Sequence, residues 1–193
     1  FEREGIRLVF TVDCGMMNHS EIADAVERDM DVIVIDHHHV PEELPKAFAI
    51  VNPKFPDSPY PFHDLCGAGT TFRVVDALYR RFLPDARGEL KWLLDLVAIG
   101  TVADCVPLVG ENRVLVKYGL VVLSKTRTVG LREMFQVGGI AVSEDQMPNA
   151  ETISFQIGPR INAASRMAHA KTAHDLLMTE LPAEARLLAL ELE

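Results

Sequence analysis

The sequence predicts an α/β fold, with a parallel β-sheet flanked by helices and a long connector helix at the end. Two short apolar runs, at 6–12 and 31–35, are rich in β-branched residues, and a stretch with helical spacing separates them. Strand, helix and strand in this order form a βαβ unit, which joins parallel strands. Both runs are followed directly by polar clusters, at the strand ends where open parallel sheets bind ligands.

Each further element has its own signal. The run at 6–12 is apolar on both faces, as expected of a buried strand. Ile22, Val26 and Met30 recur at helical spacing after the capping residue Asn18. The other predicted elements are a strand at 47–51, helices at 67–82, 89–99 (which would bury Trp92), 112–123 and 131–137, and an extended stretch at 151–157. A last helix starts near Ala170 and runs to the end without a stop signal.

The length of 193 residues and the hydrophobic fraction of 48% suit one globular domain with the start of a second element. We place the domain at residues 1–168 and the start of the connector helix at 169–193. No stretch of about 18 uncharged apolar residues occurs, so we expect no membrane span. Cys14, Cys66 and Cys105 make an odd count without metal-type spacing, which favours a reduced, cytoplasmic setting.

The net charge of −9 is unusual for a protein that grips nucleic acid through its phosphates. Such proteins generally carry a basic footprint. The charge therefore argues against strong nonspecific nucleic-acid binding by this chain, although a metal site would account for part of the acidity.

Three polar groups follow apolar segments and together suggest a metal site. Asp13 and the cluster 36–38 follow the two predicted strands, and Asp104 lies in an apolar segment where a lone carboxylate would be costly. Carboxylate and imidazole ligands suit Mn²⁺, Zn²⁺ or Fe²⁺. Each residue also has a simpler interpretation: Asp13 as a helix cap, the histidines as surface residues, Asp104 as an arginine's partner. The residues alone leave both interpretations open.

The same segments carry a family resemblance. TVDCG at 11–15, DHH at 36–38 and GTVADCVPL at 100–108 resemble three motifs of the DHH phosphoesterase superfamily. The segment at 51–72 and GPRINAASR at 158–166 resemble, in particular, the RecJ family of exonucleases. The motifs occur in the family's order along nearly the whole chain, which makes a chance similarity improbable.

The resemblance implies roles for five of these residues. Asp13 would bridge two Mn²⁺ (or Mg²⁺) ions in the complete enzyme, and His37 and Asp104 would be further metal ligands. His38 is similar to a catalytic histidine that faces the scissile phosphate. Asp36 is similar to a carboxylate that orients a histidine, the role that supporting carboxylates have at many metal sites.

Arg160, Asn162 and Arg166 resemble the motif near the substrate's phosphate path, where planar arginine groups suit phosphate. The alternative for Arg160 is a structural ion pair with an acidic residue beneath the last helix. Ser165 stands where the family motif has glycine. The helix start at 67–71 is a weaker candidate for phosphate contact, because close packing explains its glycines equally well.

The resemblance implies a 5′→3′ exonuclease of single-stranded DNA in recombination and repair, with a single-strand-binding protein and a helicase as further partners. The family's first aspartate-rich motif and its accessory domain are not among these residues, so we expect the 193-residue chain to have weak or no activity. Two other functions remain open: a phosphodiesterase or pyrophosphatase for small nucleotides, and a catalytically inactive nucleic-acid-binding scaffold.

Overall fold

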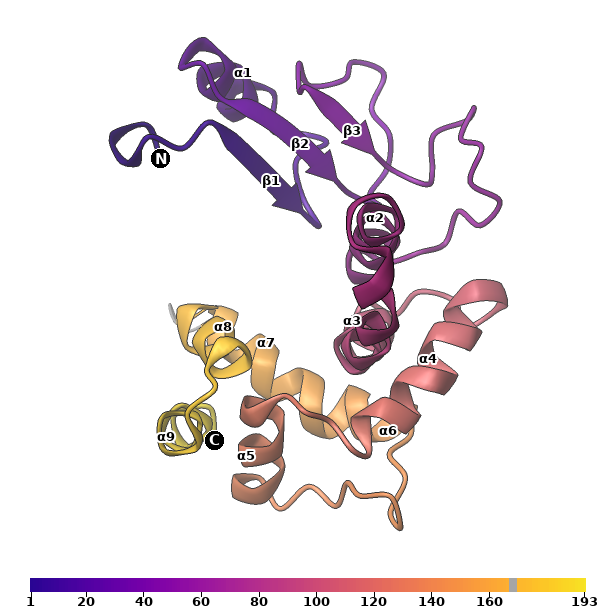
Figure 1. Ribbon diagram of the computed structural model, residues 1–193, viewed down its shortest axis with the longest axis vertical. Coiled ribbons are helices and arrows are strands. Elements are labelled where there is room, and N and C mark those ends of the chain that lie inside the picture. Colours follow the sequence, from indigo (N-terminus) through magenta and orange to yellow (C-terminus); the bar gives the residue numbers. More distant parts are fainter. Residues whose placement is uncertain (167–169) are drawn as a thin grey trace. The chain divides into compact units, whose positions relative to one another are not determined.

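The computed structural model describes residues 1–166 and 170–193, and for 163–166 it describes the backbone only. The chain divides into two compact units. Unit 1 contains Phe1–Arg87 and Asp104–Val114, and unit 2 contains Gly88–Ala103 and Leu115–Glu193. The elements of both units are labelled in Figure 1.

Unit 1 is built on a three-stranded parallel sheet, which confirms the predicted fold class. Its strands β1 (Leu8–Val12), β2 (Asp31–Ile35) and β3 (Ala49–Val51) lie in the order β1-β2-β3 (Figure 1). In the register, Ile35 pairs with both Val12 and Val51. The carboxyl ends of the three strands therefore lie level with one another, and the residues that follow them share one edge of the sheet.

Two helices pack on this sheet. Helix α1 (His19–Glu27) forms the crossover between β1 and β2, and α2 (Gly67–Phe82) contacts both strands. The small core of unit 1 consists of buried apolar side chains from the sheet, α1 and the loop before it: Met16, Ile22, Val32 and Val34. Burying each of these side chains contributes about 1.5–3 kcal/mol. This core holds the ends of β1 and β2 in place, and the polar clusters follow those ends.

Strand β1 differs from the sequence prediction in its burial. The apolar run predicted a strand buried on both faces, but Leu8, Phe10 and Val12 are 48%, 49% and 45% exposed. Within the described residues β1 is an edge strand, paired on one side only with β2. The apolar run therefore predicted the strand correctly, but the prediction that both of its faces are buried is wrong.

Unit 2 is helical. A 3₁₀ segment, Pro84–Leu93, leads from unit 1 into α3 (Leu94–Ala103), and α4 (Gly110–Leu123) leads back into unit 2. The remaining elements are α5 (Val129–Val137), α6 (Ala150–Thr152), a π-helix (Ile153–Ile157), α7 (Gly158–Arg166), α8 (Ala170–Met178) and α9 (Pro182–Glu191). Their core is apolar and fully buried, with Leu131, Met134, Ile153, Ile157 and Leu176 at its centre.

Three predictions for this unit differ from the structure. The helix predicted at 89–99 is 3₁₀ as far as Leu93 and α-helical only from Leu94 to Ala103. The stretch at 151–157 is helical rather than extended, because Asn149 and Thr152 form a capping box that starts a helix at Ala150. The single helix predicted from Ala170 onward is two helices. Leu181 has extended backbone angles, as expected of a residue before proline, and Pro182 opens α9 at a position where proline is favoured.

The remaining predictions concern the domain boundary, the cysteines and membrane-spanning helices. The proposed domain boundary between residues 168 and 169 lies outside the described residues. No disulfide joins Cys14, Cys66 and Cys105, all of which lie in the described part of the chain. None of the helices in the described residues combines the length and hydropathy needed to cross a bilayer.

Candidate metal centre

Asp13 is the first residue after β1, and its backbone conformation directs its side chain beyond the end of the sheet. Its N–H donates to the carbonyl of Ile35 at 2.9 Å, and its φ of 63° lies in the left-handed region. A non-glycine residue adopts this conformation at a cost of roughly 1–2 kcal/mol. Such strain is concentrated at functional sites.

The carboxylate of Asp13 lies at the N-terminus of α2. Gly67 is the first residue of that helix, and a Cβ built there would overlap the Asp13 carboxylate. Glycine is therefore required at position 67 for Asp13 to occupy this place. The arrangement is also electrostatically favourable, because a helix N-terminus carries partial positive charge.

Asp36 follows β2 and organises the turn that carries both histidines. Its carboxylate is 1% exposed and accepts from the backbone N–H groups of His37 (2.8 Å), His38 (3.2 Å) and Met16 (3.2 Å). Burial alone would raise the pKa of Asp36, but the hydrogen bonds from His38 and the backbone outweigh it and lower that pKa below its ordinary value. Asp36 is thus an ionised anchor for the turn.

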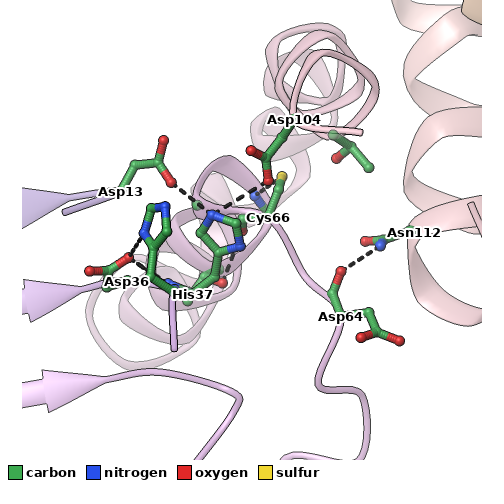
Figure 2. Close-up of polar contacts among 12 residues, drawn as sticks. Asp13, Asp36, His37, Asp64, Cys66, Asp104 and Asn112 are labelled. Atoms are coloured by element: carbon green, nitrogen blue, oxygen red, sulfur yellow. Dashed lines mark hydrogen bonds and ion pairs between the residues drawn. The ribbon is translucent and has the colours of Figure 1, made fainter. Parts of the chain in front are cut away.

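His37 brings the strand ends and the segment after α3 together. Its Nε2 lies 3.0 Å from Asp13 Oδ1 and 3.4 Å from Asp104 Oδ2 (Figure 2). The imidazole side chain is only 7% exposed, whereas the Asp13 and Asp104 side chains are 55% and 36% exposed. The three side chains converge from residues far apart in sequence, with the carboxylates on the solvent side.

The geometry of this cluster suits a divalent cation. Both ring nitrogens of His37 are buried, and neither has a hydrogen-bond partner among the described residues, although Nε2 faces two carboxylate oxygens. Two ligands at about 2.1 Å from one ion and at right angles lie about 3.0 Å apart. The distance from His37 Nε2 to Asp13 Oδ1 matches that spacing, and the distance to Asp104 Oδ2 is 0.4 Å longer. Ligand atoms of Asp13, His37 and His38 also lie within 4.8 Å of one another.

His38 has a different environment from His37. Its Nδ1 lies 2.7 Å from Asp36 Oδ1, and its side chain is 59% exposed. Because Asp36 is ionised, this contact assigns the proton to Nδ1 and leaves Nε2 as the nitrogen with a lone pair. His38 is therefore placed to exchange a proton with a group in solvent.

Two buried asparagines that the sequence analysis did not single out hold the loops around the cluster. Asn52, just after β3, donates to the carbonyl of His38 at 2.9 Å. Asn112 donates to the carbonyls of Asp64 (2.6 Å) and Pro107 (3.0 Å), which joins the loop before α2 to the segment that carries Asp104 (Figure 2). Asn52 directly follows β3, which was an available signal, whereas Asn112 lies in the first turn of α4 and had no such signal in the sequence.

A second set of contacts in unit 1 fixes the loop between β3 and α2. Tyr60 donates from its hydroxyl to Glu111 at 2.8 Å, and Arg73 pairs with the same carboxylate. Burial and the neighbouring Glu111 raise the pKa of Tyr60 to about 12. Glu111 precedes Asn112, so these contacts secure the segment after Asp104 to α2 as well.

The predicted phosphate-contacting residues lie in unit 2. Arg160 pairs with Glu193 and donates to the carbonyl of Gln156 at 2.6 Å, which is the kind of structural ion pair expected as its alternative role. This ion pair lowers the pKa of Glu193. Asn162 is exposed, and the side chain of Arg166 lies outside the described residues. A phosphate role for these three residues stays a prediction.

The fold and the cluster define an α/β domain with a candidate cation site where parallel strands end. The chain belongs to the DHH family: the family model described as "DHH family, N-terminal domain" matches residues 3–101. Among curated proteins, the chain is 43% identical over 192 residues to the single-stranded-DNA-specific exonuclease RecJ of Bacillus subtilis. That match covers 100% of this chain and 23% of the relative, so the chain spans about a quarter of its length.

Solved structures give the same likeness. The crystal structure of RecJ in complex with Mn²⁺ from Thermus thermophilus matches with a TM-score of 0.83 and 39% identity, over 98% of this chain and 27% of that one. A structure of RecJ from the same organism in complex with Mg²⁺ matches with a TM-score of 0.71 and 37% identity, over 96% of this chain and 24% of that one. The predicted α/β class is therefore confirmed by structure as well as by sequence.

Proposed function

We propose that this chain forms part of a metal-dependent exonuclease that removes nucleotides 5′→3′ from single-stranded DNA in recombination and repair. The convergence of Asp13, His37 and Asp104 at one point carries the proposal. It is supported by the likeness to RecJ proteins, whose names specify single-stranded DNA. A single-strand-binding protein and a helicase as partners, and a cytoplasmic location, rest on the family resemblance alone.

The proposed ligands of the cation are Asp13, His37 and Asp104, and the proposed ion is Mn²⁺ or Mg²⁺. Support for the ion comes from the related structures that contain Mn²⁺ and Mg²⁺. A divalent ion held there would polarise a phosphate oxygen and lower the pKa of a bound water. Asp13 is well suited to the task because its left-handed backbone and the glycine at position 67 fix the direction of its carboxylate.

The neighbouring residues have proposed roles that follow from their hydrogen bonds. Asp36 holds the turn and directs the proton of His38 to Nδ1. His38 then presents Nε2 to solvent, where it would exchange a proton with the leaving oxygen of the substrate. Asn52 and Asn112 position the turn and the Asp104 segment without touching the substrate.

Direct measurement of metal binding tests this proposal on the 193-residue chain. We expect calorimetric titration with Mn²⁺ to show binding that weakens by at least about tenfold in Asp13→Asn and Asp104→Asn. Asparagine is the right replacement at position 13, because it tolerates a left-handed backbone and keeps the size of the side chain. Asp145→Asn, a change of the same kind in an exposed loop of unit 2, is the matched control.

The outcomes separate the candidate functions. Equal or negligible Mn²⁺ binding in the wild-type chain and the two cluster variants, with circular dichroism showing folded protein, would favour the inactive scaffold. In the complete protein that contains this chain, Asp13→Asn should abolish nucleotide release from long single strands. Faster hydrolysis of dinucleotides or pyrophosphate than of long single strands would instead favour the small-nucleotide phosphodiesterase.

A further inference from the structure

Unit 2 carries a hollow that the metal centre does not use. Two aromatic, two lysine and several apolar side chains line it, among them Lys91, Trp92, Leu94, Tyr118, Val121 and Lys125. Its volume of about 380 Å³ lies within the range of small-ligand sites. The sequence analysis assigned Trp92 to the core, but the residue is only partly buried.

The packing of two helices creates this hollow. Trp92 lies just before α3, which begins at Leu94, and Tyr118 lies on α4. At Gly119 the two helices touch, because a Cβ there would overlap the carbonyl of Leu94 and lie 2.5 Å from the Cβ of Ala98. Tyr118 is therefore held beside the start of α3, with 55% of its surface exposed.

Cations surround the two aromatic rings. The guanidinium of Arg127 lies 3.6 Å from the centre of the Trp92 ring, and the Lys91 ammonium lies 5.6 Å from it. Lys117 lies 5.9 Å from the centre of the Tyr118 ring. Glu89, which is 3.4 Å from Arg127, offsets one of these charges.

The lysines at this surface are available to a ligand. Among the described residues, Lys91, Lys117 and Lys125 form no ion pair, although the chain as a whole has a net charge of −9. Among the described residues Lys46 and Lys54 in unit 1 likewise form no ion pair, so what distinguishes this face is the position of its cations beside two aromatic rings. Its charge complements an anionic ligand.

We propose that this surface, which we call the Trp92–Tyr118 surface, binds single-stranded nucleic acid, with a base in the hollow and phosphates on the lysines. Flat aromatic walls combined with cations are how single strands are bound without sequence preference. An acidic protein partner would satisfy the charges but would not require an open, ring-lined hollow. The inference rests on the proposed function, because it supplies a second contact for the same class of substrate.

The single tryptophan of the chain makes a direct test possible. Oligothymidylate is titrated into the 193-residue chain in the presence of a chelator, and the fluorescence of Trp92 is followed. We expect saturable quenching that weakens steeply as salt rises. Tyr118→Ala and Lys125→Glu should each lower the affinity by about tenfold, whereas Tyr118→Phe, which keeps the ring, should bind nearly as well.

The matched control is Lys46→Glu, which makes the same charge change at an exposed lysine of unit 1 and should leave the affinity unchanged. Absence of quenching, equal binding by all variants, or equal quenching by polyglutamate would overturn the proposal, and the last result would indicate an acidic protein partner. The chelator removes any contribution of bound metal. Failure of this test therefore leaves the Mn²⁺ measurement on the Asp13 cluster unaffected.

Discussion

The pKa values of two buried aspartates, one in each unit, are shifted in opposite directions. In unit 1, Asp76 pairs with Arg87 at 2.6 Å and Arg80 at 2.7 Å, and Arg87 above all lowers its pKa. In unit 2, Asp95 is 1% exposed and raised in pKa by burial, with the hydroxyl of Thr126 and the N–H of Leu96 as donors. At Asp95 burial outweighs the neutral donors, whereas at Asp76 the hydrogen bonds from charged arginines outweigh burial.

The difference matches what each unit has to do. Unit 1 uses ionised carboxylates to fix loops, and Asp36 shows the same principle at the candidate metal centre with three backbone donors and His38. Unit 2 is stabilised by an apolar core, in which a carboxyl group is tolerated best in its neutral form. Substitutions of these aspartates should therefore have effects that differ in size and in dependence on pH.

The largest effect is expected for Asp36→Ala in unit 1. The change leaves the N–H groups of Met16, His37 and His38 without their acceptor, at a cost of about 3 kcal/mol in the free energy of unfolding. Asp36→Asn keeps one carbonyl oxygen and should lose less. Urea denaturation followed by circular dichroism measures both, and a wild-type midpoint for the alanine variant would show that Asp36 does not anchor the turn.

A smaller effect is expected for Asp76→Asn, which should lower the free energy of unfolding by about 1–2 kcal/mol at neutral pH. The loss is limited because Arg80 and Arg87 are 61% and 47% exposed and are rehydrated when the carboxylate is removed. A folded-state pKa below the unfolded value adds stability above the unfolded pKa, near 3.8, and this stability disappears as the pH falls through the folded pKa.

The difference between wild type and Asp76→Asn should therefore shrink when urea midpoints are compared at pH 7 and at about pH 3. Asp85→Asn, which changes an exposed acid near the same ion pairs, should match wild type at both values. A difference that stays constant with pH would mean that the arginines do not stabilise the ionised carboxylate.

The sequence predicted the local elements of unit 1 well. The strand at 31–35 and the helix at 67–82 have the predicted bounds, because apolar period and capping residues depend on near neighbours in the chain. The strand-end rule predicted that Asp13 and His37 lie together, and the family resemblance implied Asp104 as a further ligand; the structure brings the three side chains within contact distance. Their role as ligands stays a prediction.

Features that depend on distant contacts were not predictable in the same way. Whether β1 is buried depends on what pairs with its second edge, and the sequence of the strand does not contain that information. The side chains of Asn52 and Asn112 donate hydrogen bonds to carbonyls 14 and 48 positions away in the sequence. The Trp92–Tyr118 surface arises where α3 and α4 touch at Gly119, so its apolar residues looked like ordinary core in the sequence.

The smallest effect at neutral pH, and the sharpest test of the contrast, is expected for Asp95→Asn in unit 2. The folded-state pKa of Asp95 is raised, so above the unfolded value of 3.8 the folded state binds more protons than the unfolded state. The contribution of Asp95 to stability is therefore complete below that value and is lost as the pH rises through the folded pKa. Asparagine cannot titrate, and it keeps an oxygen that can accept from Thr126 or Leu96.

Urea midpoints of wild type and Asp95→Asn should therefore converge, or change order, as the pH rises from about 4 to 7. At pH 7 we expect their free energies of unfolding to differ by less than about 1 kcal/mol. The trend is opposite to that for Asp76→Asn, whose loss of stability relative to wild type grows as the pH rises. If the deficit of Asp95→Asn also grew with rising pH, Asp95 would be stabilised in its ionised form. Hydroxyl and amide donors would then suffice to hold a buried charge in unit 2, and the presence of arginine would not be what distinguishes the two units.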